Sequence, residues 1–223
     1  MTQSELMHTD FQELLGATRV VPVITIADAA DAVPLARALV AGGLQALEVT
    51  LRTDAGLDAI REIADAVPQA VVGAGTVTTA DQLLAARGAG ASFIVSPGCT
   101  DALADAAREA GGAFLPGAVT ASEVLRLLER DITLMKFFPA ETSGGVAALK
   151  ALGGPFPQVR FCPTGGIDLE RAGSYLALPN VVCIGGTWMV PAQLIAEHRW
   201  ERITALASEA SAATRQPQPT STH

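Results

Sequence analysis

The stretch "ALEVTLRTDAGLDAIREIADAVPQAVVGAGTV", residues 46–77, contains one complete unit of the pattern that decides the fold. An apolar, β-branched run at 46–51 is followed by helical periodicity at 54–68 and by a second strand-like run at 71–77. Two strands separated by a helix indicate parallel pairing, because the chain crosses back over the sheet before it pairs again.

The same unit recurs along the chain. Between the strand-like runs lie Ala/Leu-rich segments that open with Thr, Asp or Ser at a candidate N-cap and close with Gly. The runs occupy residues 19–26, 46–51, 71–77, 92–98, 113–119, 133–138, 159–166 and 181–186. Eight strands alternating with helices over about 200 residues predict an α/β fold of the (β/α)8 TIM barrel type.

An open, doubly wound parallel sheet is the alternative to the barrel. That fold is expected to carry a glycine-rich dinucleotide fingerprint after its first strand. The corresponding stretch here, "TIADAADAVP" at 25–34, has no such glycines. The pattern therefore favours the barrel.

The chain divides into three parts. Residues 19–214 form the predicted catalytic domain, with no linker inside it. Residues 1–18 form an N-terminal extension with a short helix, "DFQELLGA", expected against one end of the domain. The Pro/Gln/Thr-rich residues 215–223 are expected to be a disordered tail.

Composition excludes several classes of function. The 223-residue chain is 49% hydrophobic and has a formal net charge of −8, which argues against nucleic acid as a partner. No signal peptide is evident, and no apolar run reaches the roughly 18 residues of a membrane span, so we expect a cytoplasmic protein without membrane attachment. The three cysteines and three histidines lack zinc-ligand spacing, and we expect neither metal nor cofactor.

Strand parity directs two charged residues inward. In the run at 46–51, Leu47 and Val49 form the apolar set that should face the helices. Glu48 and Arg52 belong to the opposite set, which points into the barrel near its carboxyl end. Charges inside a barrel are costly unless they are used, and barrel active sites form at this end.

A lysine lies in an apolar context in "LMKFFPAE", residues 134–141. Lys136 shares a strand face with Leu134, and Thr76 lies near the carboxyl end of its own strand. We expect Glu48, Arg52, Thr76 and Lys136 to converge at one mouth. The other interpretation is a buried ion pair of Glu48 and Lys136 that serves only the fold.

Two glycine pairs follow the last two strands. Gly165 and Gly166 lie in "PTGGI", and Gly185, Gly186 and Thr187 lie in "IGGT". Glycine lets backbone N–H groups approach an anion closely, and barrels often bind phosphate with the loops after strands 7 and 8. These residues are candidates for a phosphate site.

The candidate residues suit one chemistry in particular. Burial disfavours the charged form of a lysine, and a neutral Lys136 amine can attack a ketone to form a Schiff base. Glu48 can transfer the protons, while Arg52 and Thr76 can bind the carboxylate of a 2-oxo acid. Two alternatives stay open: an isomerase or epimerase that uses Glu48 and Lys136 without a covalent intermediate, and a catalytically silent sensor of a sugar acid phosphate.

Three motifs carry a family resemblance: "LEVTLRT" at 47–53, "KFFPAE" at 136–141 and "RFCPTGGI" at 160–167. Over about residues 19–192 the chain resembles the bacterial 2-keto-3-deoxy-6-phosphogluconate (KDPG) aldolase and 4-hydroxy-2-oxoglutarate (KHG) aldolase family. The resemblance implies a class I aldolase that is a homotrimer. It would cleave KDPG to pyruvate and glyceraldehyde 3-phosphate, the closing step of the Entner–Doudoroff route, and could also cleave 4-hydroxy-2-oxoglutarate.

The resemblance also implies residue roles. Lys136 would be the Schiff-base lysine and Glu48 the proton acceptor and donor, with the substrate carboxylate on Arg52 and Thr76. The remaining implied contacts are Phe138 and Pro97 at the pyruvyl group, Thr164 at the aldehyde-derived hydroxyl, and Gly165, Gly166, Gly185 and Gly186 at the phosphate. Thr187 stands where many members have serine, so the hydroxyl is retained and the added methyl is expected to affect substrate preference.

Overall fold

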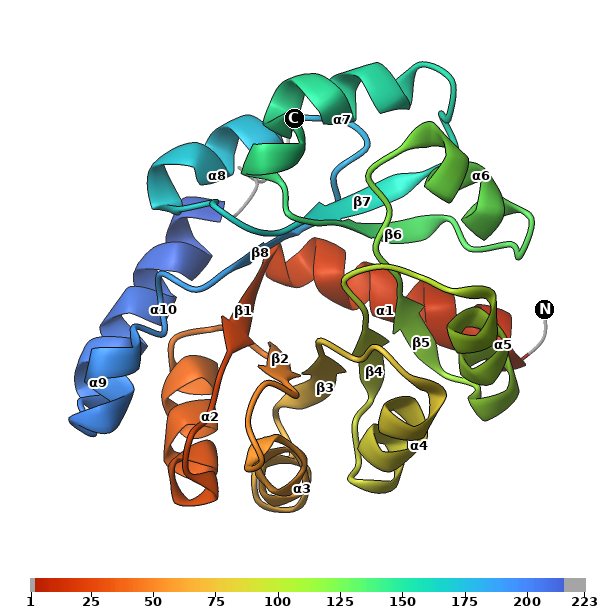
Figure 1. The fold of residues 1–223 in the computed structure, drawn as a ribbon. Coiled ribbons are helices and arrows are strands. Elements are labelled where there is room, and N and C mark those ends of the chain that lie inside the picture. Colours follow the sequence, from red (N-terminus) through yellow and green to blue (C-terminus); the bar gives the residue numbers. More distant parts are fainter. Residues whose placement is uncertain (1–2, 215–223) are drawn as a thin grey trace, which may run out of the picture.

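The computed structural model describes residues 3–214, so the tail predicted at 215–223 lies outside the described residues. Strands and helices alternate through this part of the chain, and Figure 1 shows most of the helices around the outside of the strands, with the N-terminal helix (red) lying behind them. The strands are β1 (Val20–Ile24), β2 (Ala46–Thr50), β3 (Val71–Gly75), β4 (Phe93–Val95), β5 (Ala113–Leu115), β6 (Leu134–Phe137), β7 (Arg160–Pro163) and β8 (Ile184–Gly186). Each lies within one of the eight predicted runs, and all their pairings are parallel.

The helices between the strands begin where the sequence supplies caps. Thr79, Thr100 and Thr120 each accept a backbone N–H of the first turn, and Thr120 forms a capping box with Glu123. The helices are α1 (Gln3–Thr18), η1 (Ala29–Asp31), α2 (Ala32–Ala41), α3 (Gly56–Ala66), α4 (Ala80–Gly88), α5 (Asp101–Ala110), α6 (Ala121–Leu128), η2 (Glu141–Ser143), α7 (Gly145–Gly153), α8 (Leu169–Leu176), α9 (Ala192–Ala196) and α10 (Trp200–Thr214). Between residues 3 and 214, none is both long and apolar enough to cross a membrane.

The prediction of a closed (β/α)8 TIM barrel is wrong. The strands form a curled six-stranded sheet in the order β5-β4-β3-β2-β1-β8 and a separate two-stranded sheet of β6 and β7. Between β5 and β6 the only pairing is the isolated bridge of Gly117 and Lys136. Between β7 and β8 there are likewise only isolated bridges, of which Thr164–Gly185 is one.

Proline and short strands explain the two interruptions. Strands β5 and β8, which border the two interruptions, have three residues each, so few residues are available to pair with a diverging neighbour. Pro116 follows β5 and Pro163 ends β7, and neither has an N–H to donate across the gap. Counting strands in a sequence does not show where such a ladder breaks.

The sheet has an outer and an inner apolar face. Outward-facing residues such as Leu47 and Val49 pack with the helices in the main core, as strand parity predicts. A second cluster fills the interior between the strands, and α1 contributes Phe11 and Leu15 to it. The rings of Phe11 and Phe93 are 4.9 Å apart, so α1 closes the end of the interior where the strands begin.

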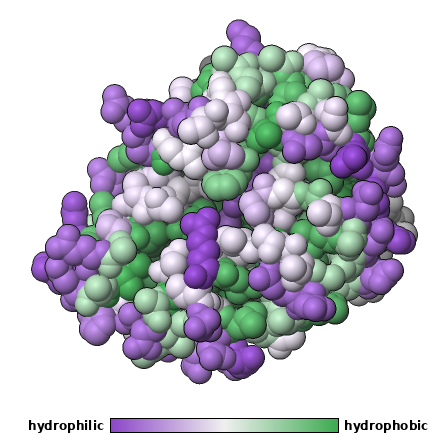
Figure 2. Space-filling model, in the orientation of Figure 1, coloured by the Kyte–Doolittle hydropathy of each residue, from purple (hydrophilic) through white to green (hydrophobic). Residues whose placement is uncertain are grey.

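The outer surface differs in polarity between its rim and its middle. Figure 2 shows strongly hydrophilic side chains around much of the rim of the face in view and weakly polar and apolar residues toward its middle, where a strongly hydrophilic side chain also stands out.

We predict that Phe11→Ala lowers the free energy of unfolding by about 3 kcal/mol, because it removes a buried ring that packs on Phe93. Urea denaturation followed by circular dichroism measures the effect. Leu84→Ala is the matched control, since Leu84 is 56% exposed and its loss should change stability by less than about 0.5 kcal/mol. A Phe11→Ala effect no larger than that of the control would contradict the role given to α1.

Candidate active site

A buried ion pair crosses the interior between the two sheets. Lys136 Nζ on β6 lies 3.0 Å from Glu48 Oε1 on β2, and the two side chains are 6% and 4% exposed. Each shares a strand face with an interior apolar residue, Leu134 on β6 and Ala46 on β2. The inward direction predicted from strand parity is therefore correct for both residues.

Glycines on β3 make room for the interior side chains. Gly75 lies beside Glu48, and a Cβ built on it would lie 2.2 Å from Glu48 Oε1. Gly73, two residues earlier on the same face, leaves space for the ring of Phe93 in the same way. The sequence reasoning missed this role, although glycines at alternate positions within one predicted strand were a visible signal.

Thr76 reaches Arg52 because the strand ends at Gly75. By parity alone Thr76 shares a face with Val72 and Ala74, and those two pack toward the helices. Thr76 instead has a left-handed backbone conformation, with φ of 59°, which breaks the alternation. Arg52 Nε donates to Thr76 Oγ1 at 3.1 Å, so these two polar residues lie together at the carboxyl end of neighbouring strands.

Phe138 lies between the lysine and the first glycine pair. The centre of its ring is 5.3 Å from Lys136 Nζ, and a Cβ on Gly165 would lie 3.3 Å from the ring. The aromatic face can stabilise a positive charge on the lysine nitrogen.

Pro97 lies against Gly117, a residue that pairs with the strand of Lys136. A Cβ on Gly117 would lie 2.1 Å from the Pro97 carbonyl oxygen, so only glycine allows this approach. Gly117 is bridged to Lys136, whose N–H donates to the Pro116 carbonyl at 2.8 Å. The loop after β4 thus lies against Gly117, which is itself bridged to Lys136.

Thr164 brings a buried hydroxyl without a partner. It is 6% exposed, and within residues 3–214 its Oγ1 makes no hydrogen bond. A Cβ on Gly185 would lie 2.3 Å from this oxygen, which shows how closely β8 approaches. Buried hydroxyls nearly always find partners, so the unpaired Oγ1 suits a bound water or ligand.

The glycine pairs differ in their placement. Gly165 and Gly166 follow β7 with φ of 103° and 78°, whereas Gly185 and Gly186 are the last two residues of β8 rather than a loop after it. In the described part of the chain, the N–H groups of Gly166 and Thr187 make no hydrogen bond. Free N–H groups of this kind can bind an anion.

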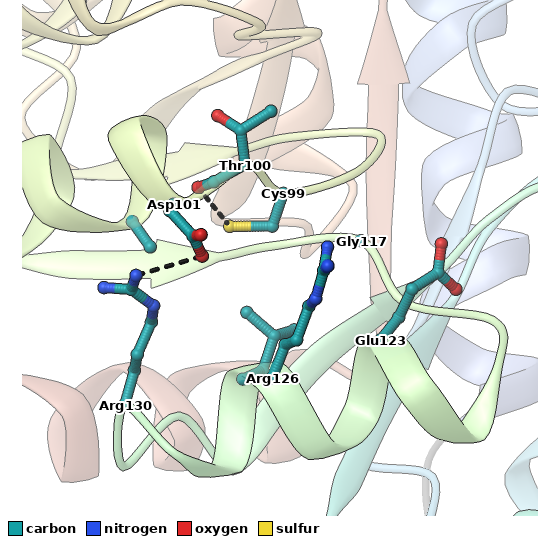
Figure 3. A pocket seen from close by; sticks show the side chains of 9 residues that line it. Cys99, Thr100, Asp101, Gly117, Glu123, Arg126 and Arg130 are labelled. Atoms are coloured by element: carbon teal, nitrogen blue, oxygen red, sulfur yellow. Dashed lines mark hydrogen bonds and ion pairs between the residues drawn. The ribbon is translucent and has the colours of Figure 1, made fainter.

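A separate hollow of about 90 Å³ lies between the start of α5 and α6, as Figure 3 shows. Arg130 pairs there with Asp101 at 3.0 Å and with Asp105 at 2.5 Å. Burial raises the pKa of the Cys99 thiol to about 11, with Arg130 opposing the shift, so the thiol stays protonated at neutral pH. None of the predicted site residues lines this hollow, and it is not the candidate active site.

Comparison with known proteins identifies the family. The family model for KDPG and KHG aldolase matches residues 11–206. The chain belongs to this family. It is 52% identical over 201 residues to the 2-dehydro-3-deoxy-phosphogluconate aldolase of Pseudoalteromonas atlantica, covering 90% of this chain and 94% of the relative. It is 51% identical over 202 residues to the KHG/KDPG aldolase of Escherichia coli, covering 91% and 95%.

Solved structures of KDPG aldolases have the same fold. The Legionella pneumophila enzyme, with pyruvate captured at low pH as a covalent carbinolamine intermediate, superposes with a TM-score of 0.88. It is 42% identical, and the match covers 94% of this chain and 98% of that chain. The Zymomonas mobilis enzyme with 3-phosphoglycerate has a TM-score of 0.86 at 49% identity, with coverage of 92% and 96%.

We predict that Gly75→Ala lowers the rate of pyruvate release from KDPG by about 100-fold, because the new methyl group displaces the Glu48 carboxylate. A coupled lactate dehydrogenase assay measures the rate. Gly88→Ala is the matched control, since nothing lies within 4 Å of a Cβ at that helical position. Equal activity of the two variants would show that the Glu48 carboxylate tolerates displacement.

Proposed function

We propose that this chain is a class I aldolase that cleaves KDPG to pyruvate and glyceraldehyde 3-phosphate through a Schiff base on Lys136. The observation that carries the proposal is the buried contact of Lys136 Nζ with Glu48 Oε1 at 3.0 Å. Around it lie a candidate carboxylate clamp, Arg52 with Thr76, and free N–H groups for a phosphate. The names of the relatives support the same reaction.

The reaction begins with transfer of the ammonium proton from Lys136 to Glu48. The free amine attacks the C2 carbonyl of the substrate, and the proton that the nitrogen then loses passes to the former carbonyl oxygen to give a neutral carbinolamine. A proton returned by Glu48 lets the C2 hydroxyl leave as water, which produces a protonated imine. The interior excludes bulk water around both groups, and the short separation allows direct proton transfer.

The protonated imine then accepts electrons. Glu48, ionised again after the loss of water, takes the C4 hydroxyl proton as the aldehyde carbonyl forms, and the electrons of the C3–C4 bond move toward the imine nitrogen to leave an enamine. Glu48 then returns this proton to C3 of the enamine, which restores the imine. Addition of water at C2 releases pyruvate and regenerates the Lys136 amine, so the cycle requires no external oxidant or reductant.

The other candidate residues each bind a different part of the substrate. Arg52 and Thr76 bind the carboxylate, while Phe138 packs on the pyruvyl group and Pro97 lines its pocket. The unpaired Thr164 hydroxyl faces the aldehyde-derived hydroxyl. The proposed phosphate site consists of Gly165, Gly166, Gly185, Gly186 and Thr187.

Two further parts of the proposal, the second substrate and the assembly, rest on the family resemblance, and the location rests on the sequence alone. We propose 4-hydroxy-2-oxoglutarate as a second substrate, in line with the name of the E. coli relative. The homotrimeric assembly and the cytoplasmic location stay predictions. An isomerase or epimerase would use the same two residues without a covalent intermediate, so imine trapping separates the two functions.

We predict that sodium borohydride with pyruvate labels Lys136 and abolishes activity, since reduction turns the imine into a stable secondary amine. The chain has only two lysines, which makes peptide mass spectrometry unambiguous. Lys136→Met should abolish labelling and lower turnover by about 10⁴-fold, whereas the exposed Lys150→Met should retain both. Lys136→Arg keeps a charge beside Glu48, so inactivity of this variant excludes simple loss of the ion pair as the cause. Normal turnover of Lys136→Met would falsify the mechanism.

We predict that Glu48→Gln slows turnover by about 10²–10⁴-fold, because the amide keeps the shape of the carboxylate but cannot carry the proton. Imine formation should persist at a reduced rate. Single-turnover mixing with pyruvate followed by quenching in borohydride measures imine formation apart from cleavage. A variant with both steps at the wild-type rate would exclude Glu48 as the proton carrier.

A further inference from the structure

Glu141 ends the "KFFPAE" motif and takes no part in the chemistry described above. It opens η2, five residues after Lys136, and faces the first glycine pair. Its N–H donates to the Gly165 carbonyl at 3.1 Å, and the N–H of Ala140 donates to the Thr164 carbonyl at 2.8 Å. The backbone on both sides of Ala140 thus holds the loop after β7.

The backbone contact determines where an N–H group points. The Gly165 carbonyl and the Gly166 N–H belong to one planar trans peptide and therefore point in opposite directions. Because Glu141 holds the carbonyl, the Gly166 N–H is directed away from η2. In the described part of the chain this N–H has no hydrogen-bond partner, so it is available to a ligand.

The Glu141 side chain limits movement of the same glycine. A Cβ on Gly166 would lie 2.7 Å from Glu141 Cγ, so the methylene groups of the side chain lie directly against the Gly166 backbone. Gly166 has φ of 78°, a conformation that this packing maintains. Shortening the side chain opens space into which the loop can relax.

Two partners hold the carboxylate in place. The Tyr175 hydroxyl donates to Glu141 Oε1, and Arg171 Nε lies 3.5 Å from Oε2. Tyr175 is 1% exposed on α8, the helix that begins just after the loop. Burial and the hydrogen bond to Glu141 raise the pKa of Tyr175, so its hydroxyl remains a proton donor at neutral pH.

The contacts with Tyr175 and Arg171 also reduce the repulsion between the Glu141 carboxylate and a bound phosphate. The carboxylate is 37% exposed beside a loop that would hold a phosphate, and two anions at such a place repel each other. The Tyr175 hydroxyl and the Arg171 guanidinium, which also pairs with Asp168 at 2.5 Å, offset part of the negative charge and so reduce the repulsion between Glu141 and a bound phosphate.

We propose that Glu141, anchored by Tyr175, is a positioning residue that sets the Gly165–Gly166 loop for the phosphate and so favours phosphorylated over unphosphorylated 2-oxo acids. This inference rests on the proposed function, because it assumes that the loop binds the substrate phosphate. Loss of the anchor should weaken binding of the phosphate end and leave the chemistry at Lys136 unchanged.

The test compares two substrates on one set of variants. For Glu141→Ala, kcat/KM for KDPG should fall at least about tenfold, mainly through KM, with kcat/KM for 4-hydroxy-2-oxoglutarate within about twofold of the wild type. The inhibition constant of inorganic phosphate should rise in parallel. Tyr175→Phe should shift the substrate ratio in the same direction, and Glu141→Gln, which retains the methylene groups and an acceptor oxygen, should restore most of it. Glu170→Ala is the matched control for loss of an exposed carboxylate near the start of α8.

The outcomes separate this inference from the proposed function. An equal fall for both substrates, or an unchanged ratio and an unchanged phosphate inhibition constant, would overturn the positioning role of Glu141. Borohydride trapping of pyruvate does not involve a phosphate. If trapping at Lys136 fails in the wild type, the proposed function fails; if trapping succeeds while the substrate ratio stays constant, the inference about Glu141 alone fails.

Discussion

The contact between Lys136 and Glu48 is the constraint on which the rest of the site depends. Taking two charges out of water costs several kcal/mol per ion, and a well-packed apolar pair would often be at least as stable. The interior offers many apolar neighbours, so stability does not explain why charges occupy it. A proton that can move between an amine and a carboxylate 3.0 Å apart gives the pair a chemical use that an apolar pair lacks.

Glycines, which have no side chain, determine the shape of the site as much as the larger residues do. Gly75 leaves the space that Glu48 fills, Gly117 lets the Pro97 carbonyl approach the lysine strand, and Gly166 accommodates Glu141. At each position a Cβ would come within 2.7 Å or less of a neighbouring heavy atom. A glycine in a turn usually supplies backbone freedom. Each of these glycines instead leaves space for a neighbouring group that must lie at a fixed position.

Much of this arrangement could be predicted from the sequence. Strand parity correctly turned Glu48 and Lys136 inward, because a period of two is a local property of each strand. The closed barrel was wrong because the continuity of the sheet depends on long-range pairing, which Pro116 and Pro163 interrupt. By parity Thr76 shares the face of Val72 and Ala74, which pack toward the helices, and only its left-handed backbone brings it to Arg52. A single residue that leaves the strand conformation in this way produces no periodic pattern in the sequence.

The interruption of the sheet gives the ion pair a second consequence. Glu48, Arg52 and Thr76 lie on or just after strands of the six-stranded sheet, whereas Lys136 and Thr164 lie on or just after the two-stranded one. Strand pairing between the two sheets is limited to isolated bridges, and the Lys136–Glu48 contact adds a polar side-chain link across an otherwise apolar interior. A substrate that forms an imine with Lys136 while its carboxylate rests on Arg52 would span the same two sheets. In the proposed mechanism the substrate would therefore take over a connection that the ion pair provides in the free enzyme, and the acid released from that pairing would become available for proton transfer.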